Sequence, residues 1–225
     1  GGMVSSAGSL LLGGFRLNPT DPLTTVCATQ VPCPETGFQI DNGGLITVAS
    51  SAPMLNYGNA QISGNLYNAG AFVSRNSTNT SGGVAYRQTL NVGTDPLFGG
   101  GSGQLQNIGD FVLEQRNTLR NFGIVANSGT MTLAGGTLQQ EAQGALLNTG
   151  NLVIGTGGQL TMAGSKTLDP FGNRVARVIN QGRIHVGDGG TLHNNWLLRV
   201  DTLASGPAQL TVGTGGMLTQ DGDAV

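Results

Sequence analysis

Apolar residues recur at fixed distances from asparagine and glycine along the middle of the chain. Four segments share the form Asn-x-Gly, with apolar residues four and six positions after the asparagine: Asn107-Ile-Gly109, Asn127-Ser-Gly129, Asn148-Thr-Gly150 and Asn180-Gln-Gly182. Asparagine and glycine tolerate left-handed backbone, so these residues predict turns. The alternating apolar pair that follows each turn predicts a strand with one buried face.

A second turn signal follows three of these strands, eight or nine residues after the asparagine, and leads to a leucine eleven or twelve residues after it. Gly135-Gly136, Gly157-Gly158 and Gly189-Gly190 each precede a leucine of a further strand by two residues. Because turns and strands recur every 20 to 32 residues, the chain is expected to coil on itself with its turns stacked. The pattern predicts an all-β, single-chain parallel β-solenoid, expected to be right-handed, with coils of roughly 20–22 residues and loop insertions.

The repeat divides the chain into two parts. Residues 1–36 lack it, and residues 37–225 carry it, with loop excursions near 74–103 and 163–177 that have turn-rich composition. The amino-terminal segment contains three consecutive leucines, Leu10, Leu11 and Leu12. A solenoid must cover its first coil, so this segment is expected either to cap that coil or to reach as a strand into a neighbouring subunit.

The last predicted coil departs from the pattern at its start. Gly206 stands where the asparagine is expected, and Leu210 and Val212 follow it four and six residues later. The repeat then continues to the end of the given sequence without a polar cap. We therefore expect the carboxyl-terminal face of the stack to be covered by further residues or by another molecule.

Composition narrows the classes of function. The chain has 39 glycines in 225 residues without a Gly-X-Y period, which excludes collagen, and only 10% of its residues are charged. A net charge of −2 without a basic run lacks the electrostatic footprint of nucleic-acid binding. The apolar run from Ser9 to Phe15 is far shorter than the ~20 residues of a transmembrane span, so no such segment is expected.

Two cysteines, Cys27 and Cys33, close a short proline-flanked loop. In an oxidising compartment this spacing favours a disulfide, and in a reducing one the two residues would remain thiols. A loop this short would stabilise the fold only modestly, since it restricts little chain entropy.

No catalytic or metal-binding motif emerges. The twelve acidic residues are scattered, and Asp110 shares its repeat position with the amide of Asn151 rather than with a second acid. Neither His185 nor His193 has partners at zinc-binding spacing. Asp188 lies in a Gly-rich turn, but calcium-binding solenoids need an aspartate in successive repeats. We expect no cofactor, no metal and no enzymatic activity.

The Asn-x-Gly unit with its later Gly-Gly-x-Leu resembles the repeats of bacterial surface β-helices over about residues 38–220. These include filamentous-haemagglutinin-like adhesins and autotransporter passenger domains. The resemblance implies an extracellular or cell-surface, non-enzymatic rod. Two interpretations follow: a subunit that self-assembles end to end into a filament or sheath, or a stalk or binding segment of an adhesin that recognises a surface or host glycan. A carbohydrate-active β-helix enzyme ranks third. The filament interpretation predicts a homo-polymer formed through chain ends and Leu10–Leu12.

Overall fold

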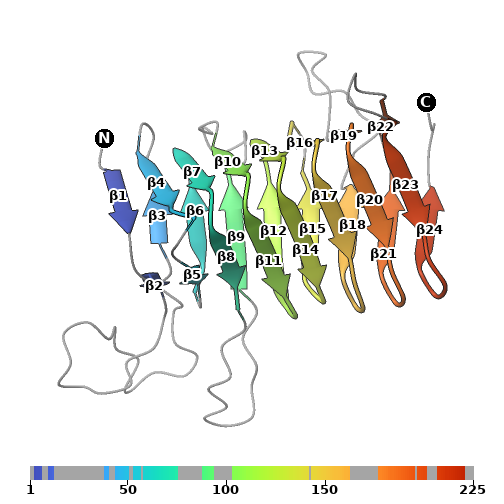
Figure 1. Ribbon diagram of the computed structural model, residues 1–225, viewed down its shortest axis with the longest axis horizontal. Coiled ribbons are helices and arrows are strands. Elements are labelled where there is room, and N and C mark those ends of the chain that lie inside the picture. Colours follow the sequence, from blue (N-terminus) through green and yellow to red (C-terminus); the bar gives the residue numbers. More distant parts are fainter. Residues whose placement is uncertain are drawn as a thin grey trace, which may run out of the picture.

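The computed structural model describes residues 3–6, 10–12, 38–40, 44–50, 53–56, 58–75, 88–93, 103–141, 143–162, 177–195, 197–201 and 207–220. Within these residues the chain is all-β and forms three eight-stranded sheets in which every strand pair is parallel. The chain visits the sheets in turn, so eight coils of three strands each stack into a rod with its termini at opposite ends (Figure 1). The predicted parallel β-solenoid is confirmed.

The three sheets are named A, B and C in the order in which each coil enters them. Sheet A contains β1 (Met3–Ser6), β4 (Leu45–Val48), β7 (Asn65–Asn68), β10 (Gln104–Asn107), β13 (Ile124–Asn127), β16 (Ala145–Asn148), β19 (Arg177–Asn180) and β22 (Leu197–Val200). Sheet B contains β2 (Leu10–Leu12), β5 (Pro53–Asn56), β8 (Ala71–Ser74), β11 (Asp110–Glu114), β14 (Thr130–Ala134), β17 (Asn151–Ile154), β20 (Arg183–Val186) and β23 (Gln209–Val212). Sheet C contains β3 (Phe38–Ile40), β6 (Ala60–Ile62), β9 (Gln88–Val92), β12 (Asn117–Asn121), β15 (Thr137–Gln140), β18 (Gln159–Met162), β21 (Thr191–Asn194) and β24 (Met217–Gln220).

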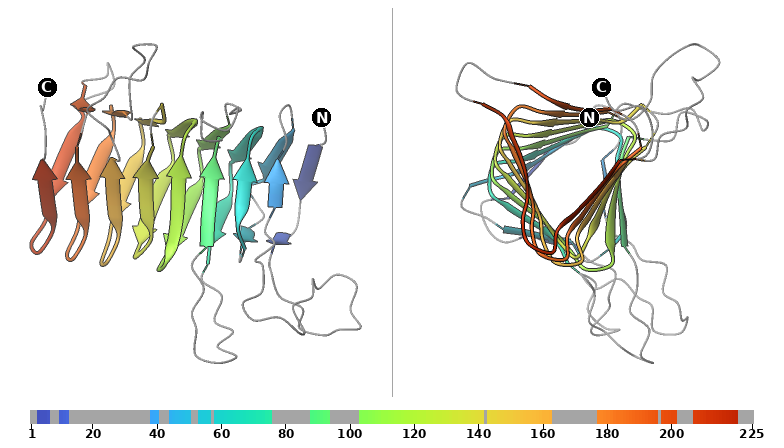
Figure 2. Two further views of the ribbon diagram at one scale, coloured as in Figure 1. Left: turned by 180° about the vertical axis from the view of Figure 1, so that it is seen from behind. Right: turned by 90° about the vertical axis from the view of Figure 1, so that its right-hand side faces the viewer.

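The three sheets surround the long axis of the rod (Figure 2). The buried apolar side chains of the core lie inside them, in register from coil to coil. Alternate residues of each strand point inward and are buried, as expected for a pleated strand with one wet face. Along sheet B, Phe72 and Phe111 are register partners, and their rings stack with centroids 4.9 Å apart. Because identical positions lie above one another, each apolar side chain packs mainly on its equivalent in the next coil.

Each coil has three strands where the sequence pattern predicted two. The additional strand lies in sheet A and ends at the asparagine of the motif, as in Gln104–Asn107. Such a strand shows one apolar residue, Leu105 here, because the second inward position is the asparagine itself. The period-2 apolar signal is therefore absent, although the strand is half buried.

The motif asparagines have a different role from the predicted turn. Asn107, Asn127, Asn148 and Asn180 end strands of sheet A, and their side chains are buried within the rod. Among the described residues other than glycine, only Arg116 and Gln143 have positive φ. Left-handed backbone is thus not the reason for asparagine at these positions, and the earlier explanation is wrong on this point.

The buried asparagines form a continuous ladder of hydrogen bonds through five coils. Asn68 donates from Nδ2 to Oδ1 of Asn107, and the same 2.7 Å bond joins each next pair, ending at Asn180. Each amide also donates to the first carbonyl of a sheet B strand one coil further on, as Asn127 does to Asn151 O at 3.0 Å. Only a short side chain with both donor and acceptor satisfies this arrangement, which explains why the position is asparagine.

The motif glycines are required by close approach between coils. A Cβ atom on Gly129 would lie 2.1 Å from the Gly109 carbonyl oxygen, and one on Gly150 would lie 2.2 Å from that of Gly129. By contrast, the later Gly-Gly turns do use left-handed backbone, with φ of +85° at Gly135 and +70° at Gly157. The two glycine signals of the repeat therefore have different physical causes.

The amino-terminal segment contributes strands to these same sheets. β1 pairs with β4 in sheet A, and β2, which is Leu10–Leu12, pairs with β5 in sheet B. Cys27, Cys33 and most residues of the expected loop excursions lie outside the described residues. β9 is a strand within the first of these excursions. No helix long and apolar enough to cross a membrane occurs in the described part of the chain.

Replacing Asn127 by alanine tests the ladder. The change removes one bond accepted from Asn107 and two donated bonds, to Oδ1 of Asn148 and to the carbonyl of Asn151, so buried polar groups lose these partners. We expect the free energy of unfolding to fall by about 2–4 kcal/mol. Thr132→Ala, on the outer face of the next sheet in the same coil, should change it by less than about 1 kcal/mol. Urea unfolding measures both, and equal losses would contradict the ladder's role.

Alanine at three glycines separates close approach from backbone conformation. At Gly129 the added Cβ would collide with backbone, at Gly157 it would meet only the φ restriction, and at Gly155 the nearest atom is 3.6 Å away. We expect the loss of unfolding free energy to decrease in that order, from about 3 kcal/mol at Gly129 to about 1 kcal/mol at Gly157 and near zero at Gly155. Thermal denaturation of the three variants measures these losses. Any other order would contradict the distinction between close approach and backbone conformation.

Candidate functional site

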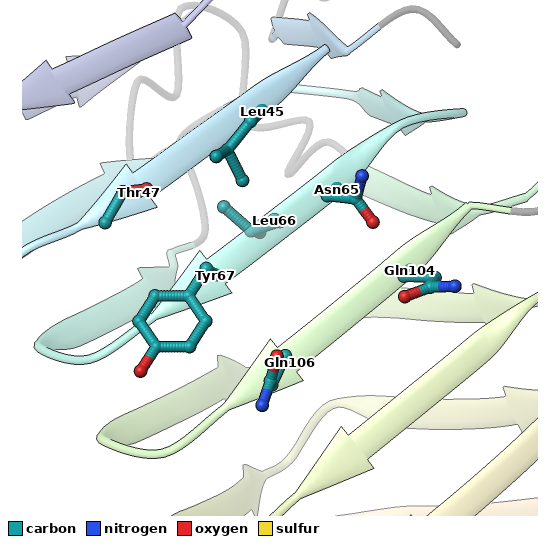
Figure 3. Close-up of a pocket in the computed structure, with 7 residues that line it drawn as sticks. All are labelled: Leu45, Thr47, Asn65, Leu66, Tyr67, Gln104 and Gln106. Carbon is teal, nitrogen blue, oxygen red and sulfur yellow. The ribbon is translucent and has the colours of Figure 1, made fainter. Parts of the chain in front are cut away.

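A groove on the outer face of sheet A is the candidate binding site among the described residues. It is an open depression with a volume of about 490 Å³. Its walls come from three adjacent strands, β4, β7 and β10, which belong to the second, third and fourth coils (Figure 3). The lining residues are Leu45, Thr47, Asn65, Leu66, Tyr67, Gln104 and Gln106.

The parallel register arranges the outward side chains of the groove in two rows along the rod. Thr47, Tyr67 and Gln106 are register partners in one row. Leu45, Asn65 and Gln104 are partners in the other row. Neighbouring members of a row are separated by the ~4.8 Å strand spacing, and the two rows lie about 7 Å apart along the strand. The backbone of the sheet thus fixes the position from which each of these side chains projects.

The lining is uncharged and combines exposed amides with more apolar surface than polar. Asn65, Gln104 and Gln106 are exposed, whereas Tyr67 and Thr47 are half-buried. None of the seven lining residues carries a charge. In the next coil the same two rows continue with Ile124 and Ala126, so the amide-rich stretch ends at β10. The groove therefore presents one aromatic ring, three amides, a hydroxyl and the side chain of Leu45 over three successive coils.

The groove was not found by sequence reasoning. Six of its seven residues fall at outward positions of sheet A strands, whereas the seventh, Leu66, is a buried core residue. The apolar pattern did not reveal most of the strands of this sheet. Tyr67 lies immediately before the motif asparagine Asn68, a position that is half-buried or exposed in the sheet A strands from β4 to β22. Comparing the residue before each asparagine would have shown Tyr67 and Gln106 at equivalent positions in the sequence.

The acidic candidates do not converge. Asp110 and Asn151 occupy equivalent outer positions of sheet B, but Thr130 lies between them in register, so they are two coils apart and not directly stacked. Three other described acids are paired with arginines: Glu114 with Arg75 at 3.1 Å, Glu141 with Arg120 at 2.6 Å and Asp201 with Arg199 at 2.6 Å.

Both histidines contact threonines of the last coil. Nδ1 of His185 lies 2.9 Å from Oγ1 of Thr211 on the outer face of sheet B. His193 makes the corresponding contact with Thr219 on sheet C. Each histidine therefore links coil seven to coil eight, a role that the sequence analysis did not anticipate. In the part of the chain that the structure describes, no three His, Cys, Asp or Glu side chains gather in a way that could hold a metal ion.

Comparison with known proteins identifies no family for the chain. Neither the protein-family models nor the curated proteins contain a match. Among solved structures the chain is similar to a hyper-glycosylated fragment of TibA whose glycosylation TibC catalyses. The two share 20% sequence identity with a TM-score of 0.27, over 82% of this chain and 68% of that chain. The fold assignment rests on the strand pairing of the chain itself.

Added metal ions should leave the stability of the protein unchanged. Asp188 lies in a corner turn whose equivalents in the coils before and after are Thr156 and Thr214, so no aspartate ladder forms there. We expect the thermal unfolding midpoint to be the same in millimolar calcium, in millimolar zinc and in a chelator, because a bound ion would raise it by mass action. A rise with either metal that the chelator reverses would contradict this expectation.

Proposed function

We propose that the chain is a non-enzymatic structural element of an extracellular or cell-surface rod, extended end to end by stacking of coils into a filament or sheath. The supporting observation is a change of exposure between the seventh and eighth coils. Val186 and Leu192 are fully buried, whereas their register partners Val212 and Leu218 are 44% and 43% exposed.

The same change occurs in all three sheets. In sheet A the buried Asn180 is followed in register by Val200, which is 44% exposed. No described residue covers these core-type side chains of the last described coil, which lie in line with the stacks below. A further coil placed at ~4.8 Å would bury them on equivalent partners and pair the free strand edges. Coils of a second copy would satisfy these requirements through a heterologous contact that does not close.

A second interpretation, a stalk or binding segment of an adhesin, is favoured by a different observation. The groove on sheet A faces sideways, away from the surfaces used in stacking, so a rod carrying it can bind a ligand along its length. Both interpretations use the solenoid as a rigid support. They differ in what covers the end coil, which is another copy in the filament and the continuing polypeptide in the adhesin.

A lysine in place of Val212 tests end-to-end stacking. Its charge would enter a dry apolar stack, so polymers of the chain should disperse into single rods. The matched control is Gln209→Lys, which places the same charge on the outward face of the same strand, β23. Negative-stain electron microscopy and sedimentation velocity give the readout, with fibres of the unmodified chain repeating at about 40 Å for eight coils.

Each outcome separates the two interpretations. Fibres from the unmodified chain and from Gln209→Lys, with single rods from Val212→Lys, support the filament. Single short rods from the unmodified chain at high protein concentration would overturn self-assembly and favour the adhesin segment.

A further inference from the structure

We propose that the sheet A groove is a binding site for a neutral glycan, with the Tyr67 ring packed against a sugar ring and the amides of Asn65, Gln104 and Gln106 on its hydroxyl groups. The proposal concerns the side of the rod and is independent of whether the ends polymerise. It assigns a ligand class to the groove from the chemistry of its lining.

The aromatic ring provides the apolar half of the recognition. Tyr67 projects outward from β7 between the two neighbouring strands, with Thr47 and Gln106 beside it in register (Figure 3). It is half-buried, so one part of the ring is supported by the protein and another part is accessible. A tyrosine combines a rigid apolar body with a polar tip. One face of a pyranose ring carries mainly C–H groups, and such a ring fits this apolar body.

The amides provide the polar half. A sugar hydroxyl both donates and accepts hydrogen bonds, and a carboxamide also does both, so each amide can pair with a hydroxyl in either sense. Gln104 and Gln106 lie two residues apart on β10 and flank the site on one side, and Asn65 lies beside Gln104 on β7. The two rows cover about 10 Å by 7 Å, comparable with about two sugar rings.

The absence of charge in the lining selects a neutral ligand. None of the seven residues is a lysine or arginine that could pair with a uronate, sulfate or phosphate. None is an acid that would attract a cation. A nucleic acid would also lack its phosphate contacts here. A neutral glycan imposes no cost of burying an unpaired charge.

The sheet geometry argues against an extended peptide as the ligand. Peptides that bind sheets commonly add a strand to an open edge, where main-chain hydrogen bonds supply affinity. At the groove, β7 pairs on one side with β4 and on the other with β10. Its backbone groups are therefore already used, and recognition must come from side chains that project outward.

The decisive experiment is titration of the full chain with neutral oligosaccharides, monitored by isothermal calorimetry. The probes are tetrasaccharides of glucose, mannose, galactose and N-acetylglucosamine, with tetragalacturonate as the charged comparison. We expect at least one neutral probe to bind with a Kd of about 0.1–1 mM, as for an open, solvent-exposed site, and the charged probe not to bind. Binding of tetragalacturonate alone would overturn the assignment to a neutral ligand.

Variants distinguish loss of the contact between Tyr67 and the sugar ring from loss of the fold. Tyr67→Ala should weaken binding about tenfold or more, whereas Tyr67→Phe should retain the ring contact and weaken it less than about threefold. Gln106→Ala should weaken binding about three- to tenfold. The matched control, Gln139→Ala on the outer face of sheet C, should bind as the unmodified chain does. Circular dichroism and the thermal midpoint verify that each variant is folded.

Two results would overturn the proposal. One is that none of the neutral probes binds with a Kd below about 10 mM, far weaker than expected for such a site. The other is that folded Tyr67→Ala binds as tightly as the unmodified chain. Val212→Lys, which acts only at the rod end, should leave glycan affinity unchanged, so failure of assembly and failure of binding are distinguishable.

Discussion

Stacking of identical backbone paths is the constraint on which this molecule depends. Each coil must follow the one before it closely enough for carbonyl oxygens to approach within van der Waals distance of the glycines above them. The asparagine ladder secures that path from inside, because each amide joins a sheet A strand end to its equivalent and to a sheet B strand of the next coil. Apolar stacking accounts for most of the buried surface. Because it is non-directional, it would also tolerate rotation of one coil relative to the next. The amide ladder is directional and fixes the corner.

Much of the fold was predictable from the sequence, and the omissions have definite causes. Sheet B and sheet C strands followed from apolar alternation after the two turn signals, as at Phe111 and Leu113. Sheet A was missed because a buried asparagine does not register as an inward residue. The same error assigned asparagine to a backbone conformation it does not adopt. A polar residue that recurs once per coil is better interpreted first as part of a buried ladder. A turn depends only on local conformational preference and does not need the same residue in every coil.

The groove was beyond sequence reasoning for a related cause. Its rows join residues from coils separated by 20 to 39 positions, and their register depends on loops of unequal length. Until the strands of sheet A are assigned, the sequence does not indicate which residues lie beside Tyr67. Once the register is known, the amides of β10 and the tyrosine of β7 form a single surface. The chain thus combines a mostly apolar interior stacked in register with an exterior whose chemistry varies from coil to coil.

Loop length leaves the ladder geometry unchanged. The amide–amide bond is 2.7 Å whether its partners are 20, 21, 32 or 39 residues apart in sequence. The chain therefore resumes the ladder in register after connections of different length. This separates two kinds of sequence change in evolution. Substitutions in the interior must preserve the fixed spacing between coils, whereas the excursions can be lengthened, shortened or exchanged. The length of a connection can therefore vary while the spacing of the stack stays constant.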